Sequence, residues 1–178
     1  MDAFSELQDA TSAAGVVFGD SMQIIIDQSK NAATTLGLSR KQVIDSANTF
    51  GTFGKSAGLA GNDLAQFSVK MTQIAGDLAS FKGGSPEEAI QAVGAALRGE
   101  SEPIRRYGVL LDDMTLRQQA VTMGLIKTTK DGLTPQQRVL AAQAEILKQT
   151  TDAQGDFART ADSRSEERRV GKECRSRW

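Results

Sequence analysis

The stretch GNDLAQFSVKMTQIAGDLASF, residues 61–81, decides the fold class of this 178-residue chain. Its large apolar side chains stand 3, 4, 3, 4 and 3 residues apart, at Leu64, Phe67, Met71, Ile74, Leu78 and Phe81. This spacing follows the 3.6-residue period of an α-helix and predicts a helix over residues 62–82 with one apolar face. The polar residues between them are expected to face solvent, at Asp63, Gln66, Lys70, Gln73 and Asp77.

Helix-start signals divide the rest of the chain into further helical segments. Ser39 with Gln42, and Thr134 with Gln137, have the spacing of a capping box. Ser85 precedes a proline and two glutamates, which is typical of a helix N-terminus. Together with the apolar spacing, these signals predict an all-α fold with helices near residues 5–14, 20–35, 40–54, 62–82, 86–98, 112–123 and 135–158.

Several glycines stand at predicted helix ends or inside predicted helices. Asn62 or Gly61 is expected to cap the helix over residues 62–82, and Gly83-Gly84 to end it. Gly76 and Gly94 lie inside predicted helices, where an interior glycine costs ~1 kcal/mol relative to alanine. They either let two helices approach closely or are simply tolerated.

The signals are weaker in two places. Residues 99–134 suggest a short helix near residues 102–107, and residues 125–133 are compatible with a small β-hairpin that turns at Lys130-Asp131-Gly132. Gly37-Leu38-Ser39 and Gly58-Leu59-Ala60 precede two predicted helices in the same way. This is a weak repeat of helix-turn-helix type and not a solenoid.

The composition changes near residue 163. The string RSEERRVGKECRSRW, residues 164–178, holds six basic and three acidic residues and the only Cys and Trp of the chain. It matches, one codon per residue, a conceptual translation of a common sequencing-library adapter; the alternative is a basic nucleic-acid-binding tail. We therefore expect residues 1–163 to be a helical fragment of a longer protein and residues 164–178 to be adapter read-through.

The remaining composition excludes several classes of protein. Residues 1–163 keep 15 basic and 19 acidic side chains, a formal charge of −4, so specific nucleic acid binding is not expected. The chain has no His and one Cys, and so lacks an imidazole base and a thiolate metal cluster. The longest apolar runs, residues 15–18 and 24–26, are far shorter than the ~18 residues that cross a bilayer. We expect no membrane span.

One glycine-rich motif suggests nucleotide binding but fails on spacing. Residues 51–56, GTFGKS, end in the Gly-Lys-Ser of a phosphate-binding loop. That loop needs a glycine five positions before the Gly-Lys pair, where Thr49 stands, and a strand before it. A glycine-rich loop that ends a helix is the preferred interpretation.

Pairs of adjacent charged residues are no stronger evidence for a catalytic or binding site. Glu87-Glu88 and Asp112-Asp113 stand near predicted helix starts, where carboxylates favour the helix dipole, so capping is preferred over acid-base catalysis. Arg105-Arg106 beside Tyr107 is an anion-site candidate, with a solvated helix end as the alternative. A hydrolase would need a carboxylate dyad in a cleft. We expect no catalytic, cofactor-binding or metal-binding residue and no enzymatic activity.

Five phrases of the chain, taken in order, resemble the conserved N-terminal region of phage tail tape measure proteins. They are LGLSRKQVIDSANTFGTFGKSAGL (36–59), TQIAGDLASF (72–81), SPEEA (85–89), ALRGESEPIRRYGVLLDD (96–113) and GDFART (155–160). Their order and approximate separations also fit. Several phrases in register are more specific than any one of them.

The resemblance implies a structural role. Tape measure proteins are long, largely helical proteins with coiled-coil character, found in phages and prophages, that occupy the lumen of the growing tail tube. Their length sets the number of tube rings, and they leave the tail ahead of the DNA. Because a helix advances ~1.5 Å per residue, helical length converts directly into distance.

The same resemblance implies partners and a location. The partners are the tail tube protein, tail assembly chaperones, tail-tip or baseplate proteins and further copies of the chain. The location is the virion tail, and the host cytoplasm during assembly. We expect an elongated or loosely packed fragment that is helical and self-associates. The alternative is a free-standing helical interaction or adaptor module of bacterial or prophage origin.

Overall fold

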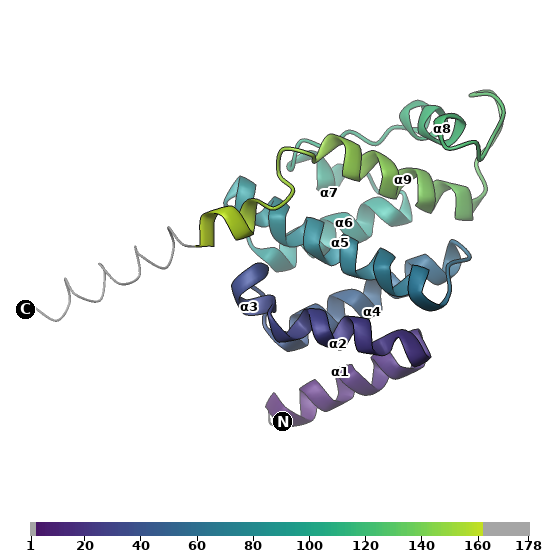
Figure 1. Cartoon of the computed structure of the whole chain (residues 1–178). Coiled ribbons are helices and arrows are strands. Elements are labelled where there is room, and N and C mark those ends of the chain that lie inside the picture. The colour runs from purple at the N-terminus through teal and green to yellow at the C-terminus, as the bar shows by residue number, and fades with distance from the viewer. Residues whose placement is uncertain (1–2, 162–178) are drawn as a thin grey trace, which may run out of the picture.

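The computed structural model describes residues 3–161 (Figure 1). Between those residues all regular secondary structure is helical and no strand occurs, so the all-α prediction is confirmed. The elements are α1 (Ala3–Phe18), the short 3-10 helix η1 (Gly19–Ser21), α2 (Met22–Lys30), α3 (Ala32–Thr35), α4 (Arg40–Ser56), α5 (Gly61–Lys82), α6 (Pro86–Arg98), α7 (Glu102–Arg105), α8 (Asp113–Thr122) and α9 (Pro135–Gln149). Residues 156–161 are again helical and are called the return segment. The adapter interpretation of residues 164–178 lies outside the described residues.

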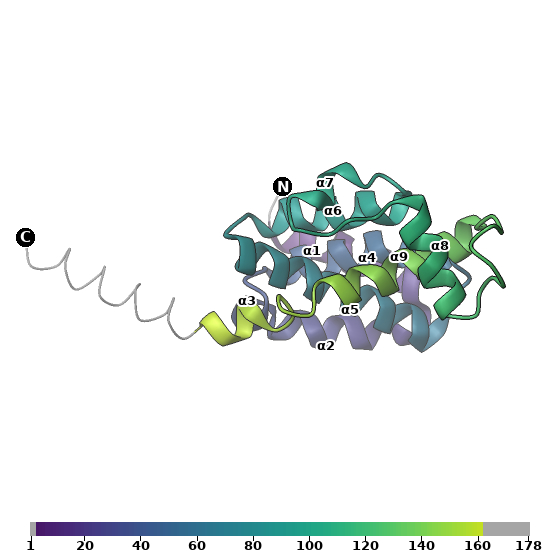
Figure 2. The ribbon, with the colours of Figure 1, turned by 90° about the horizontal axis from the view of Figure 1, so that it is seen from above.

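The helices stack roughly in the order of the chain, as Figure 1 and the view from above in Figure 2 show. α1 forms one end of the stack, followed by α2 with α4 and then by α5 with α6, while α9 and α8 form the other end. α5 lies in the middle, between α4 and α6. The return segment comes back beside the C-terminal end of α5 (Figure 1).

The apolar stripe of α5 is a core face. Leu64, Phe67, Met71, Ile74 and Leu78 are all buried, and only Phe81 at the C-terminal end stays 48% exposed. The stripe is therefore covered by other helices of the same chain.

Large apolar side chains are fully buried in the interior of the stack. Phe50, Ile25, Ile44, Ile104 and Ile146, which come from both ends of the stack, are each 0% exposed. Burying a side chain of this size contributes about 1.5–3 kcal/mol to folding. Three clusters of buried side chains fill the stack, and α4 and α5 contribute to the two larger ones.

The helix starts that the sequence predicted are confirmed at three positions. Ser39 and Thr134 form complete capping boxes, in which each side chain accepts from the backbone N–H three residues on. Ser85 accepts from the N–H of Glu88, and a proline follows it. Gly83 ends α5 in the left-handed conformation, as predicted.

The predicted cap of α5 is wrong. Ala60 occupies the N-cap position and makes no side-chain cap bond. The side chain of Asn62 accepts instead from Ser21 Oγ at 2.8 Å, so it ties η1 to α5. A long-range hydrogen bond has replaced the local one that the sequence pattern predicted.

The weak repeat has a structural counterpart. Gly37 and Gly58 both adopt a left-handed conformation, with φ of 67° and 83°. Each is followed by a leucine and by an extended N-cap residue, Ser39 or Ala60, that opens the next helix. Glycine is needed at both positions because other residues rarely adopt this φ.

Of the two interior glycines, one permits a close approach. A Cβ on Gly76 would lie 3.3 Å from Leu36 Cδ2, which is tighter than ordinary contact. At Gly94 the nearest atom, Phe53 Cε2, would be 3.7 Å away. Close packing therefore accounts for Gly76, while Gly94 is tolerated.

The first two predicted helices differ from the observed ones in where they end or break. The helix predicted over residues 5–14 continues through Gly15 to Phe18, because Ala14 and Phe18 are buried against α4. The helix predicted over residues 20–35 is interrupted by η1 and at Asn31. There the hydroxyls of Thr34 and Thr35 both donate to Asn31 O at 2.9 Å, and such local bonds compete with a regular helix.

The last predicted helix and the hairpin also need correction. Residues 135–158 do not form one helix: α9 ends at Gln149, and Gly155 with φ of 77° reverses the chain before the return segment. Residues 125–133 form turns, in which Asp131 N–H donates to Thr128 O at 3.1 Å, and not a hairpin. A two-stranded hairpin without further strands is only marginally stable. The short helix expected near residues 102–107 is present as α7.

Candidate functional site

The glycine-rich motif at residues 51–56 is helical, as the C-terminal part of α4. A Cβ on Gly51 would lie 2.7 Å from Val17 Cγ1, and one on Gly54 would lie 2.6 Å from Leu64 Cδ1. Lys55 Nζ donates to Val16 O at 3.3 Å. The motif is therefore a packing surface for α1 and α5, because a phosphate cradle needs free loop N–H groups turned toward the ligand.

The carboxylates at the start of α6 are engaged by side chains nearby. Glu87 accepts hydrogen bonds from Ser85 Oγ and Gln42 Nε2, and these bonds, Ser85 first, lower its pKa below the ordinary value. Glu88 forms an ion pair with Arg106. The two glutamates therefore join α6 to other parts of the chain: Glu87 contacts α4, and Glu88 contacts the chain after α7.

The pair at the start of α8 has a similar role. Asp112 Oδ1 accepts from the N–H of Thr115 at 2.7 Å, which makes Asp112 the N-cap and lowers its pKa. Asp113 lies 2.7 Å from Arg117 Nε and 2.9 Å from Arg138 Nη2. Capping and ion pairing thus account for the contacts of both acidic pairs.

The anion-site candidate is already filled by groups of the protein. Arg105 pairs with Glu102 at 2.9 Å, and Arg106 pairs with Glu88. Arg106 Nη2 also donates to Tyr107 Oη at 2.9 Å, and its guanidinium stacks 4.9 Å from the ring centroid. Both guanidinium groups are thus neutralised by carboxylates of the same chain.

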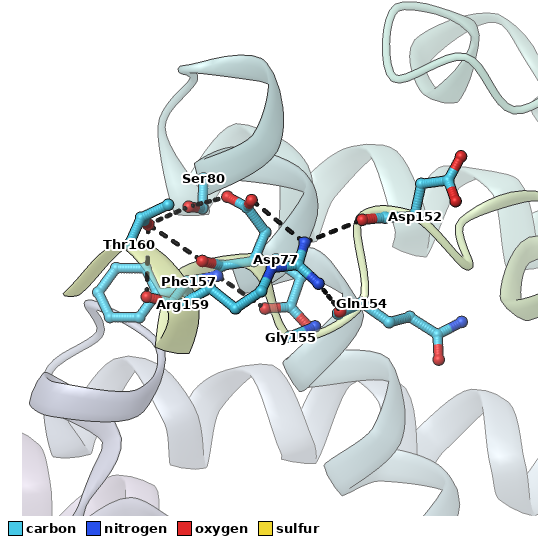
Figure 3. A network of polar contacts seen from close by, with 9 residues as sticks. Asp77, Ser80, Asp152, Gln154, Gly155, Phe157, Arg159 and Thr160 are labelled. Atoms are coloured by element: carbon cyan, nitrogen blue, oxygen red, sulfur yellow. Dashed lines mark hydrogen bonds and ion pairs between the residues drawn. The ribbon is translucent and has the colours of Figure 1, made fainter. Parts of the chain in front are cut away.

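Asp77 is the polar residue that the sequence pattern misplaced. It was expected to face solvent, yet it is 7% exposed. Its Oδ2 accepts from Gly155 N–H at 2.8 Å and its Oδ1 accepts from Phe157 N–H at 3.2 Å (Figure 3). Because the first N–H groups of a helix have no partner within it, Asp77 caps the return segment from 78 residues away.

Further polar contacts fasten the return segment. Ser80 Oγ donates to Asp156 Oδ2 at 2.6 Å and lies 3.3 Å from Thr160 Oγ1 (Figure 3). Arg159 donates to Gln154 O at 3.2 Å and to Asp152 O at 3.0 Å. The arginine closes the turn before the segment, and the serine holds the segment on α5.

The electrostatics of Asp77 have opposing causes. Burial raises the pKa of the carboxyl above its ordinary value, and the N–H groups of Gly155 and Phe157 oppose this rise. The charge on Asp156 raises the pKa of Asp77 and that on Arg159 lowers it. A buried carboxyl with a raised pKa is a general-base candidate in principle. Here each oxygen accepts a backbone N–H, so the arrangement holds two segments together.

A groove of about 1230 Å³ runs beside the return segment. Its lining consists of small or uncharged residues, among them Gly37, Gly76, Ala79, Gly83 and Phe157, and the described lining contains no ionisable side chain. A Cβ on Gly37 would lie 2.6 Å from Phe157 Cε2, so the phenyl ring lies directly on that glycine. The groove offers shape and apolar surface, and no acid, base or nucleophilic thiol.

Between residues 3 and 161 no group of three or more His, Cys, Asp or Glu side chains is placed to hold a metal ion. In the same part of the chain, every helix is too short or too polar to cross a bilayer.

In comparison with known proteins, no family model, no curated protein and no solved structure matches the chain. The sequence held one signal for the contact made by Asp77: residues 72–81 and residues 155–160 both belong to the phrases singled out in the sequence analysis. Helical periodicity alone cannot show that a distant segment covers a polar position.

Proposed function

We propose that this chain is the folded N-terminal part of a phage tail tape measure protein, which acts as tail-length ruler and scaffold for tube assembly and later takes part in DNA ejection. The observation that carries the proposal is that the five phrases of the resemblance are connected to one another by direct contacts. Asp77 in the second phrase accepts from Gly155 in the fifth. Phe157 in the fifth lies on Gly37 in the first.

The remaining phrases are joined in the same way. Gln42 in the first phrase donates to Glu87 in the third, and Arg106 in the fourth pairs with Glu88 in the third. The contacts reach across as many as 80 residues of the chain. Their mutual contacts support a resemblance that covers one folded unit.

The helix lengths support an anchor role within the proposed ruler. The 22 residues of α5 span about 33 Å, but the neighbouring helices fold back beside it and add no further length. A stack of this kind supplies an anchor, while the distance along the tail comes from chain beyond it. The partners that we propose are the tail tube protein, the assembly chaperones and the tail-tip or baseplate proteins.

Sequencing the coding locus without adapter contamination tests the proposal. We expect the reading frame to continue past Ser163 without the string of residues 164–178, between genes for tail tube and assembly chaperones upstream and baseplate genes downstream. A frame that stands among unrelated genes would instead support the adaptor module. That alternative is favoured by one observation, the closed core of the described residues.

A phage that encodes the chain allows a direct test of the anchor role. Asp77→Ala should lower the number of tails that assemble, while the tails that do form keep the wild-type length in electron micrographs. Asp63→Ala, on the exposed side of the same helix, is the matched control and should change neither quantity. In-frame deletion in the chain that follows should shorten the tail in proportion. Unchanged tail length after such deletions would refute the ruler.

A further inference from the structure

The return segment is fastened to α5 by polar groups. The carboxylate of Asp77 accepts from the N–H groups of Gly155 and Phe157, at 2.8 and 3.2 Å, and Ser80 Oγ donates to Asp156 Oδ2 at 2.6 Å (Figure 3). These bonds join the segment to the C-terminal half of the central helix. A hydrogen bond within a protein replaces one with water, so its net contribution to stability is modest.

The return segment contributes less apolar burial than the stack does. The main cluster of buried side chains reaches Ala153, and of the described residues beyond it none belongs to any of the three clusters. Phe157 lies on Gly37 but is partly exposed, and Ala158 is exposed. Because apolar burial is the main stabilising term, a segment fastened in this way is expected to open at a lower free-energy cost than the stack.

The return segment also stands between two hollows. The groove of about 1230 Å³ described above is lined by Phe157 and by Gly76 and Gly83 of α5. A second hollow of about 430 Å³ is lined by Gly155 of the turn and by Gln73 of α5, together with residues of α2. Thr35 and Ala158 line both. Lifting the segment would therefore join the two hollows into one groove along the C-terminal half of α5.

The bonds inside the return segment do not involve the stack. Arg159 donates to Gln154 O at 3.2 Å and lies 3.4 Å from Asp156 Oδ1, and Thr160 Oγ1 donates to Asp156 O at 3.0 Å. Such bonds can move with the segment when it leaves α5. Gly155, with φ of 77°, provides a flexible joint between the segment and Ala153.

We propose that the return segment is a latch, which opens and closes while the helical stack stays folded and whose opening uncovers Asp77 and joins the two hollows. In the open state the Asp77 carboxylate and the N–H groups of Gly155 and Phe157 bond to water, and the three clusters of buried side chains stay intact. The latch therefore controls access to the C-terminal half of α5. It is independent of the proposed role in a phage tail.

Hydrogen exchange of single amides, measured by NMR on the whole 178-residue chain, tests the latch. We expect the amides of Gly155 and Phe157 to be protected about tenfold less, or lower still, than those of Met71 and Ile74 in the buried middle of α5. About 1 M urea should speed exchange at Met71 and Ile74 about fivefold or more, because they exchange by global unfolding. It should change the exchange at Gly155 and Phe157 by less than about twofold, since opening the latch exposes little surface. Equal protection and equal urea dependence at all four amides would overturn the proposal.

Two variants separate the latch from the stack. Ile25→Ala should speed exchange at Met71 about thirtyfold or more and leave Phe157 within about twofold, because Ile25 stays buried when the latch opens. An equal acceleration at both amides would mean that the segment leaves α5 only when the whole chain unfolds, which would refute the latch. The second variant, Asp77→Asn, should speed exchange at Phe157 about fivefold or more. The matched control Asp63→Asn, on the exposed side of α5, should leave it unchanged. Unchanged exchange at Phe157 in Asp77→Asn would also count against the latch, since the carboxylate would then not fasten it.

Discussion

Asp77 connects the middle of the chain to its return segment through two backbone hydrogen bonds across 78 and 80 residues. A buried carboxylate is costly unless its oxygens are hydrogen-bonded, and here both oxygens accept an N–H group. The same two bonds satisfy donors at the start of residues 156–161 that the helix itself leaves unpaired. The two bonds therefore satisfy both the buried carboxylate and the N–H groups of the return segment.

Replacing the carboxylate by its amide isolates this contribution. Asp77→Asn turns an amino group toward one of the two N–H donors, and we expect the free energy of unfolding to fall by about 1–3 kcal/mol in urea titrations. Asp63→Asn, at an exposed position on the same helix, should stay within about 0.5 kcal/mol of the wild type. An Asp77→Asn variant that is as stable as the wild type would show that the second acceptor oxygen, which the amide lacks, contributes nothing to stability.

The difference in stability between the wild type and Asp77→Asn should change with pH in a direction set by the pKa of Asp77. The pKa of Asp77 is raised in the folded state, chiefly by burial, so the folded protein binds the proton more tightly than the unfolded chain does. As the pH falls through the folded pKa toward the ordinary value of 3.8, the wild type should therefore gain stability relative to Asp77→Asn. Urea titrations of both proteins at about pH 7, 5.5 and 4 measure the difference. A difference that shifts against the wild type in acid would mean that the N–H bonds to the carboxylate outweigh its burial.

At the scale of helices, local signals located starts better than ends. Ser39, Ser85 and Thr134 open helices where the sequence predicted, because an N-cap bond joins residues only three positions apart. The end of α9 could not be predicted in this way, since the return segment is capped by a residue of α5. The burial of Asp77 was missed for the same reason: periodicity describes one helix, and its covering segment lies elsewhere in the sequence.

Two helical glycines provide a matched comparison of packing with helix propensity. Gly51→Ala would place a Cβ 2.7 Å from Val17 Cγ1 and from Phe18 Cζ, so α1 must shift, and we expect a loss of about 1–3 kcal/mol. Gly94→Ala meets its nearest atom only at 3.7 Å and should stabilise α6 by about 0.5–1 kcal/mol. Thermal unfolding of the two variants measures both signs. Stabilisation by both alanines would mean that α1 is not held closely against α4.

At the scale of the whole molecule, the apolar spacing predicted which faces are buried but not what covers them. The stripe from Leu64 to Leu78 was correctly identified as one face, while its cover consists of helices on either side of it in the sequence. Spacing within a helix carries no information on the order in which helices stack.

Because α4 and α5 supply side chains to both large clusters, the two ends of the stack should unfold together. Ile25 of α2 and Ile146 of α9 belong to different clusters and are each 0% exposed. We expect Ile25→Ala and Ile146→Ala each to destabilise a single transition by about 2–5 kcal/mol. In a chain ending at Ser163, far-UV circular dichroism reports all helices, and the near-UV signal of Tyr107, the only tyrosine, reports the cluster around Ile146. The two signals should shift together in both variants, because opening either cluster exposes α4 and α5 to water. A Tyr107 transition that is insensitive to Ile25→Ala would show instead that the end of the stack formed by α1 and α2 unfolds as a separate unit.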